Sequence, residues 1–317
     1  MLDMEENVET EVPYRLNEDE TKNTDSLVER GRDSESPNII TIYVEGKNDF
    51  VFYKRWLNVS KIGSSYRKLS IKILTIKSDK SVIDPGLGNC QKIRLAADRY
   101  KDDIRKIYIS DKDLMTDSDV RKYEHLDLLF FTDFPAIESY GFMDEILCKL
   151  NKDRYGGNVE SLENCGEFIG RYLRGIYFYR CSLYGQENSE GMNKKAHELH
   201  EKFKSYVSNN RGNFSIDGFV EFADEIIPDE IVNIMKSIDY DNVDPRAYIY
   251  GHDVGPVING FITCYNNEWR SGYPASKNNH IEQYVRDNYI DGGFYENDNL
   301  FKSLRMRIEH IYKLTMK

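Results

Sequence analysis

The chain has 317 residues, of which 40% are hydrophobic, and a formal net charge of −11. It is long enough to form one large domain or two ordinary ones around a hydrophobic core. No apolar run approaches the roughly 20 residues that a membrane-spanning helix needs, and the acidic N-terminus is unlike a signal peptide. We therefore expect a globular cytoplasmic protein that does not contact a membrane.

The negative charge is concentrated at the N-terminus. Residues 1–36 contain twelve acidic and four basic side chains, a net charge of −8, whereas the remaining 281 residues carry −3. A segment so poor in apolar residues cannot offset the entropy lost on ordering, so we expect residues 1–37 to be a disordered acidic tail. The sequence also allows a short helix near 26–32 within this tail. The nearly neutral remainder neither requires nor excludes a polyanionic partner.

A strand, an acidic turn and a helix are predicted at 39–57 (IITIYVEGKNDFVFYKRWL). The β-branched and aromatic residues at 39–44 are typical of a buried parallel strand, and the aromatic residues that follow recur at helical spacing. Glu45 and Asp49 lie at the turn between these two elements. Ligands of open α/β sheets bind at the carboxyl ends of the strands, so this turn is a candidate functional site.

Three more apolar runs predict strands at 70–76, 106–110 and 126–131. The intervening loop at 77–89 contains neither of the glycine-rich phosphate-binding patterns GxGxxG and GxxxxGK. A helix is expected after it, at about 90–103. The third strand runs into Asp111 and Asp113, and the segment 137–147 after the fourth has helical spacing. Four strand-to-helix units predict an α/β domain over 38–148, with a parallel sheet and helices on both faces.

Five acids, Glu45, Asp49, Asp111, Asp113 and Glu138, are expected to converge at one edge of this sheet. Carboxylates packed closely raise one another's pKa unless a cation is present. Such oxygen ligands favour Mg²⁺ or Mn²⁺, which keep open positions for water and for a phosphate substrate. For any single acid, a capping role in the following helix is an equally good interpretation.

Two of these segments resemble a known family. The Glu-Gly after the first strand (YVEGKND) and the Asp-x-Asp after a later strand (YISDKD) resemble the TOPRIM domain of primases, topoisomerases and overcoming-lysogenization-defect (OLD) nucleases. VEGKNDFVFY and FTDFPAIESYGF are more narrowly similar to TOPRIM-like effectors of anti-phage defence, such as the toxic nuclease subunit of PARIS systems. The resemblance covers about 38–148, with Ser139 where that family usually has asparagine.

The resemblance implies a divalent-metal nuclease, and in PARIS-type systems an RNase directed at host tRNA. It implies catalytic and metal-binding roles for Glu45, Asp111 and Asp113, with Asp49 and Glu138 as further metal ligands. The companion protein of the family is an ABC-type ATPase, and this chain has no Walker A motif of its own. The expected partners are that ATPase and a nucleic acid, with RNA favoured over DNA, and a homodimer is left open.

Two lysines, Lys47 and Lys112, lie beside the acids in the sequence. Either could stabilise the negative charge that develops on a phosphate, and we include Lys47 among the catalytic candidates. The alternative is that each lysine only neutralises a neighbouring carboxylate.

Residues 149–317 show helical spacing interrupted by polar loops, which predicts a mainly helical C-terminal domain. His252 and Asp253 follow a β-like run, where a turn with a polar cap is the default interpretation and a role in the site is the alternative. His197 and His200 are three residues apart, so the zinc-protease spacing is missing and a solvated helix face is favoured.

Two basic stretches each allow two interpretations. Arginines alternate with aromatic residues at 171–184, a pattern that suits single-stranded nucleic acid, although an amphipathic core helix is favoured. The last stretch, 301–317, has five basic residues and one acid. It is either a docking helix for nucleic acid or an acidic partner, or a terminal helix that closes the core.

Two classes of function are left open by the sequence. The complete set of acids favours a metal-dependent TOPRIM endonuclease that acts as a toxic defence effector and is held silent by its ATPase. The alternatives are a non-catalytic TOPRIM-like binding or scaffold protein for an ATPase, and a DNA-directed OLD-type nuclease.

Overall fold

A computed structural model describes residues 38–66, 69–79, 86–157, 159, 162, 165–184, 189–210, 215–238, 243–265 and 278–315. The predicted acidic tail, and the short helix near 26–32, lie outside these residues. Within the described ranges, no helix is both long enough and apolar enough to cross a membrane.

Four parallel strands form one sheet in the order β2-β1-β3-β4. The strands are β1 (Ile39–Val44), β2 (Ser70–Thr75), β3 (Lys106–Ser110) and β4 (Leu129–Phe131). The last residues of neighbouring strands are in register, because Val44 pairs with Thr75 and Ser110 pairs with Phe131. All four strands therefore end at one edge of the sheet, with β1 and β3 at its centre.

Helices cover both faces of this sheet because both faces are apolar. On one face, Ile40 and Ile42 share a core with Trp56 of α2 (Lys47–Val59). On the other face, Tyr108 shares a smaller core with Ile93 of α4 (Asn89–Arg99). Strands that are buried on both sides require nearly continuous apolar runs, which is what the sequence contains at these positions. The α/β class with a parallel sheet covered on both faces is confirmed.

Shorter elements connect these parts. They are α3 (Ile62–Ser65), the 3₁₀ turn η2 (Ile76–Ser78), α5 (Asp117–Arg121), α6 (Ile137–Tyr140) and α7 (Asp144–Tyr155). The single helix predicted at 137–147 is thus wrong, because α6 ends before Gly141. At that residue the backbone approaches the next layer so closely that a Cβ would lie 2.5 Å from the carbonyl oxygen of Val285.

The C-terminal region is helical, as predicted. It contains α8 (Cys165–Leu183), α9 (Ser189–Asn209), α10 (Ile216–Ile226), α11 (Asp229–Lys236), η5 (Pro245–Tyr248), α12 (Gly251–Tyr265), α13 (Asn278–Asp291), η6 (Phe294–Asn297) and α14 (Asn299–Thr315). Pro228 separates α10 from α11. Proline has no amide hydrogen to donate and clashes with the preceding helical turn.

The β-like run before His252 is not a strand. Pro245 opens the 3₁₀ turn η5, which suits the fixed φ of proline, and α12 begins at Gly251. His252 and Asp253 therefore lie in the first turn of a helix. The prediction of a turn with a polar cap after a strand is wrong.

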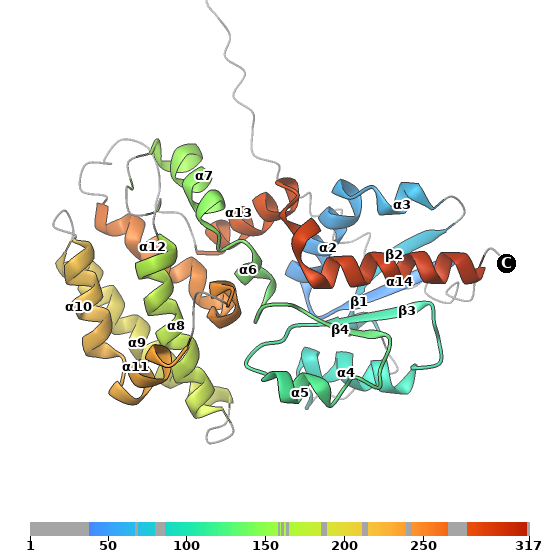
Figure 1. Ribbon diagram of the computed structural model, residues 1–317, viewed down its shortest axis with the longest axis horizontal. Coiled ribbons are helices and arrows are strands. Elements are labelled where there is room, and N and C mark those ends of the chain that lie inside the picture. The colour runs from blue at the N-terminus through green and yellow to red at the C-terminus, as the bar shows by residue number, and fades with distance from the viewer. Residues whose placement is uncertain are drawn as a thin grey trace, which may run out of the picture.

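The last two helices return to the sheet (Figure 1). The ring of Phe301 in α14 lies 5.3 Å from that of Trp56 in α2, and α13 also packs against α2. Lys302 and Arg305 lie on the exposed side of α14. Within the described residues, α14 is therefore a terminal helix that closes the core, which was one of the two interpretations of this stretch.

One hydrophobic core extends from the α2 side of the sheet into the helical region. Figure 1 shows α6 and α13 between the sheet and the bundle that contains α8 to α12. The predicted segments 38–148 and 149–317 consequently share this core, and α6 lies where the carboxyl edge of the sheet meets the bundle.

Candidate functional site: a carboxylate cluster at the sheet edge

Glu45 follows β1 directly and is hydrogen-bonded to the end of β3. Its Oε1 accepts hydrogen bonds from the hydroxyl of Ser110 and from the backbone amide of Asp111, both at 2.9 Å. Because β1 and β3 are adjacent parallel strands, their ends lie side by side. The structure thus brings together the acidic turns that follow two separate strands.

The segment after β4 holds the Asp-x-Asp turn in place. Thr132 Oγ1 accepts from the amide of Lys112 at 2.8 Å and donates to the carbonyl of Phe134 at 2.6 Å. The carbonyl of Pro135 accepts from the amide of Asp113 at 2.8 Å. Asp113 has a φ of 50°, a left-handed conformation that aspartate tolerates better than most residues. These contacts fix the backbone of the turn.

Asp49 lies in the first turn of α2 and has two roles. Its Oδ2 accepts from the amide of Gly46 at 3.0 Å, so it caps the helix as the simpler interpretation predicted. It is also buried and close enough to Glu138 and Asp111 for their charges to interact.

The acids form one electrostatic cluster, because the charge of each acid interacts with that of at least one other. Burial is the largest cause of the raised pKa values of Glu45, Asp49, Asp111 and Asp113. The pKa of Glu45 rises to about 7, with repulsion from Asp113 and Asp49. The pKa of Asp49 rises to about 6, with repulsion from Glu138. Burial raises the pKa of Asp111 well above its usual value, and all four other acids contribute.

Glu138, in α6, is paired with Arg286 of α13. Their side chains are 3% and 9% exposed, and Arg286 Nη1 donates to Glu138 Oε1. The same guanidinium opposes the rise in the pKa of Asp49. Sequence reasoning missed Arg286, which is 148 positions from Glu138 and lies in no recognisable pattern. One end of the cluster therefore has a built-in cation.

The two lysines that the sequence singled out, Lys47 and Lys112, do not pair with the acids of the cluster in the described part of the chain. Lys47 is an exposed residue at the start of α2. Lys112 Nζ donates to Asp117 Oδ1 at 2.7 Å. Among the described residues, neither lysine forms an ion pair with an acid of the cluster. The catalytic role of Lys47 stays a prediction.

Two other basic groups act on Asp113. They are Arg94 of α4 and His252 of α12, whose electrostatic interactions with Asp113 oppose the rise in its pKa that burial causes. Arg94 was not identified from the sequence, because it lies within a helix between two of the strand units and follows no motif.

A second buried polar group lies in the helical region. Arg180 of α8 donates from Nη2 to Asp253 Oδ1 at 2.8 Å, and His200 Nε2 lies 2.8 Å from the same oxygen. His200 is only 12% exposed, so the solvated-face interpretation is wrong for it. His197 is 65% exposed and fits that interpretation.

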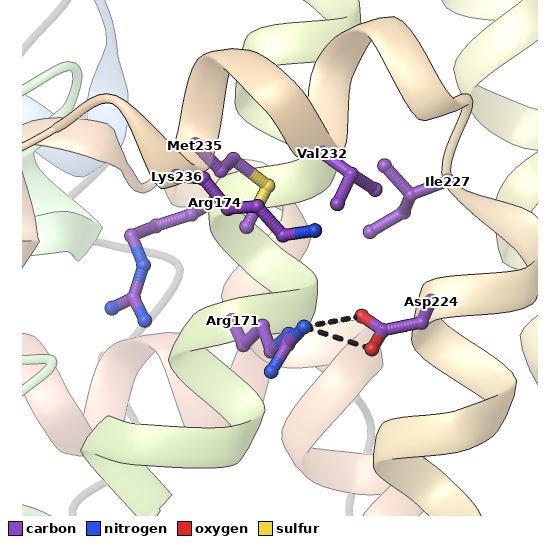
Figure 2. Close-up of a pocket in the computed structure, with 7 residues that line it drawn as sticks. All are labelled: Arg171, Arg174, Asp224, Ile227, Val232, Met235 and Lys236. Atoms are coloured by element: carbon purple, nitrogen blue, oxygen red, sulfur yellow. Dashed lines mark hydrogen bonds and ion pairs between the residues drawn. The ribbon is translucent and has the colours of Figure 1, made fainter.

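A cavity of about 350 Å³ lies away from the cluster, between α8, α10 and α11 (Figure 2). Its lining residues are Arg171, Arg174, Asp224, Ile227, Val232, Met235 and Lys236. Arg171 pairs with Asp224 at 2.7 Å, and Figure 2 shows Arg174 directed away from that aspartate. On the same helix Tyr172 and Tyr177 are buried, as the core-helix interpretation predicted. The cavity therefore contains none of the acids that the sequence singled out.

The oxygen chemistry of the cluster suits a hard divalent cation, but the side chains are not gathered around a single point. In the part of the chain that the structure describes, no three His, Cys, Asp or Glu side chains are close enough together to hold a metal ion. Like charges favour separation, and Glu45 Oε1 is engaged by Ser110 and Asp111. Glu45, Asp111 and Asp113 are the acids from which a metal site could be assembled.

Comparison with known proteins does not assign the chain to a family. No protein-family model matches it, and no curated protein is significantly similar to it.

Proposed function

We propose that this chain is a divalent-metal-dependent TOPRIM nuclease, a toxic effector of anti-phage defence that cleaves RNA, host tRNA in particular, under restraint by a partner ATPase. One observation supports the hydrolase. Glu45 after β1 and the Asp111–Asp113 turn after β3 adjoin at the carboxyl edge of neighbouring parallel strands. Buried carboxylates that repel one another favour a cation between them. The defence setting, the tRNA substrate and the ATPase follow from the family resemblance alone.

Glu45, Asp111 and Asp113 are the residues that would hold Mg²⁺ or Mn²⁺. A bound cation supplies Lewis acidity at a phosphate oxygen and lowers the pKa of water. Because these side chains are not gathered in the structure, binding requires them to turn toward a common point. Relief of their mutual repulsion favours that movement.

Glu45 has one oxygen that is left for a cation. Its Oε1 accepts two hydrogen bonds from the end of β3, so Oε2 is the atom that would bind the metal. Without a cation, burial and repulsion from Asp113 and Asp49 raise the pKa of Glu45 to about 7. A bound cation would favour the charged form of this carboxylate.

Cleavage assays on total tRNA, single-stranded DNA and plasmid, with Mg²⁺, Mn²⁺ or EDTA, test this function. Glu45→Gln and Asp111→Asn should each abolish metal-dependent cleavage without unfolding the protein. Asp127→Asn is the matched control, because Asp127 is exposed and precedes β4 at the opposite edge of the sheet. The proposal is wrong if EDTA has no effect or if either cluster variant cleaves like the wild type. Preference for DNA would select the OLD-type alternative.

A binding or scaffold role is the second candidate. It is favoured by Arg286, which already neutralises Glu138, and by the absence of a gathered metal group among the described residues. Under this function, calorimetry should show no Mn²⁺ binding and all nucleic acids should stay intact, while an ATPase partner is still bound. Mn²⁺ binding that Asp111→Asn abolishes would exclude it.

A further inference from the structure

We infer that Arg94 and His252 bind the phosphodiester backbone of the substrate beside Asp113. The inference rests on the proposed nuclease function and extends it, because it adds a phosphate-binding site to the acid cluster. Neither residue belongs to the acidic motifs that indicated the site.

Arg94 reaches the carboxyl edge of the sheet from α4. Its guanidinium carbon lies 5.6 Å from the ring centre of Phe131 and 5.7 Å from that of Tyr123. Phe131 ends β4 and pairs in register with Ser110, the residue before Asp111. The guanidinium is therefore at the level where β3 ends. Contact through its face leaves the donors at its edge for a ligand.

The hydrogen bonding of Arg94 is incomplete. Its Nε is buried and has no hydrogen-bond partner among the described residues. In the same part of the chain Arg94 forms no ion pair, in contrast to the paired arginines Arg180 and Arg286. A buried donor without a partner is destabilising, and a bound phosphate oxygen would satisfy it.

His252 approaches the same aspartate from the helical region. Its neighbour Gly251 packs so closely on α6 that a Cβ would lie 2.8 Å from Glu138 Oε2. A buried hydrogen bond of 2.7 Å from the Ser139 hydroxyl to the Ile249 carbonyl holds this approach. The backbone of His252 is therefore held beside the cluster, while its side chain is exposed and accessible to a ligand.

A phosphodiester is the ligand that these two groups fit. Arg94 and His252 both act electrostatically on Asp113, and Cys90, one turn before Arg94, interacts with Asp113 and Glu45. An acidic cluster repels a polyanionic strand, so donors next to the cluster are needed to hold the backbone there. A guanidinium and an imidazole N–H both donate to phosphate oxygens, and the guanidinium does so in bidentate geometry.

The test uses a fluorescein-labelled single-stranded RNA, and DNA of the same sequence, bound to the Glu45→Gln variant in Mg²⁺ so that the strand stays intact. Adding Arg94→Gln should weaken binding about tenfold and reduce the slope of log K against log salt by about 0.7, the value for one phosphate contact on a single strand. Arg94→Lys should restore that slope and only part of the affinity. Arg99→Gln, in the last turn of the same helix, is the matched control and should change neither quantity.

His252→Gln should weaken binding about fivefold, because it removes one hydrogen-bond donor to a phosphate oxygen. With Glu45 intact, both variants should raise KM for cleavage more than they lower kcat. Thermal unfolding verifies that each variant is folded.

The inference is overturned if Arg94→Gln binds RNA and DNA with the affinity and salt slope of its parent while the wild-type protein cleaves nucleic acid. The proposed nuclease function would survive that result. If the wild-type protein neither binds nor cleaves any of these nucleic acids, the proposed function fails and this inference fails with it.

Discussion

Replacing Glu45 with glutamine should stabilise the metal-free protein at pH 8 and leave its stability nearly unchanged at pH 4. Glutamine keeps the Oε1 atom that accepts from the Ser110 hydroxyl and the Asp111 amide. The substitution therefore removes the charge of Glu45 while retaining its hydrogen bonds and most of its shape.

The size of the effect follows from the pKa of Glu45, which rises from 4.5 to about 7 on folding. Between these values the folded state binds more protons than the unfolded state. The stability contributed by the protonated carboxyl is thus complete below pH 4.5 and is lost as the pH rises through 7. At about 1.4 kcal/mol for each pH unit, the difference corresponds to about 3 kcal/mol above pH 7.

Urea unfolding in EDTA at pH 4, 6 and 8, followed by circular dichroism, measures this free energy. Glu145→Gln, an exposed glutamate in the first turn of α7, is the matched control and should show no such pH dependence. Addition of Mg²⁺ at pH 8 should stabilise the wild type more than Glu45→Gln, since the variant lacks one of the proposed ligands. The reasoning is refuted if Glu45→Gln gains no stability over the wild type between pH 4 and pH 8.

Three further predictions concern the packing that supports the site. Phe301→Ala should lower the free energy of unfolding by about 3–5 kcal/mol, because it leaves a cavity among aromatic rings. Met306→Ala, on the exposed side of α14, should change this free energy by less than about 0.5 kcal/mol. A loss below about 1 kcal/mol for Phe301→Ala in urea unfolding would contradict a core role for α14. Arg286→Met should lower the free energy of unfolding by about 3–5 kcal/mol near neutral pH, because Glu138 is left buried without its partner. Adding Glu138→Gln should recover most of this loss, and no recovery in the double variant would argue against that pairing. Gly251→Ala should lower kcat because its Cβ would displace Glu138, and a folded variant with wild-type kcat would show that this close approach is not needed for activity.

The sequence by itself was sufficient to place the acids. An apolar run of strand length that stops at a carboxylate marks the carboxyl end of a buried strand, and this local pattern correctly put Glu45, Asp111 and Asp113 after β1 and β3. The parallel sheet and the helical C-terminal region followed from hydrophobic periodicity in the same way. These features depend on residues within a few positions of one another.

Only the tertiary structure decided what surrounds the acids. The pairing of Glu138 with Arg286 joins α6 to α13, and the approach of Arg94 to Asp113 depends on how α4 packs against the sheet. The amphipathic pattern of α14 is the same for a docking helix and for a core helix, and its contact with Trp56 distinguishes them. A periodic pattern specifies which face of an element is apolar, whereas the partner of that face is set by contacts between residues far apart in the chain.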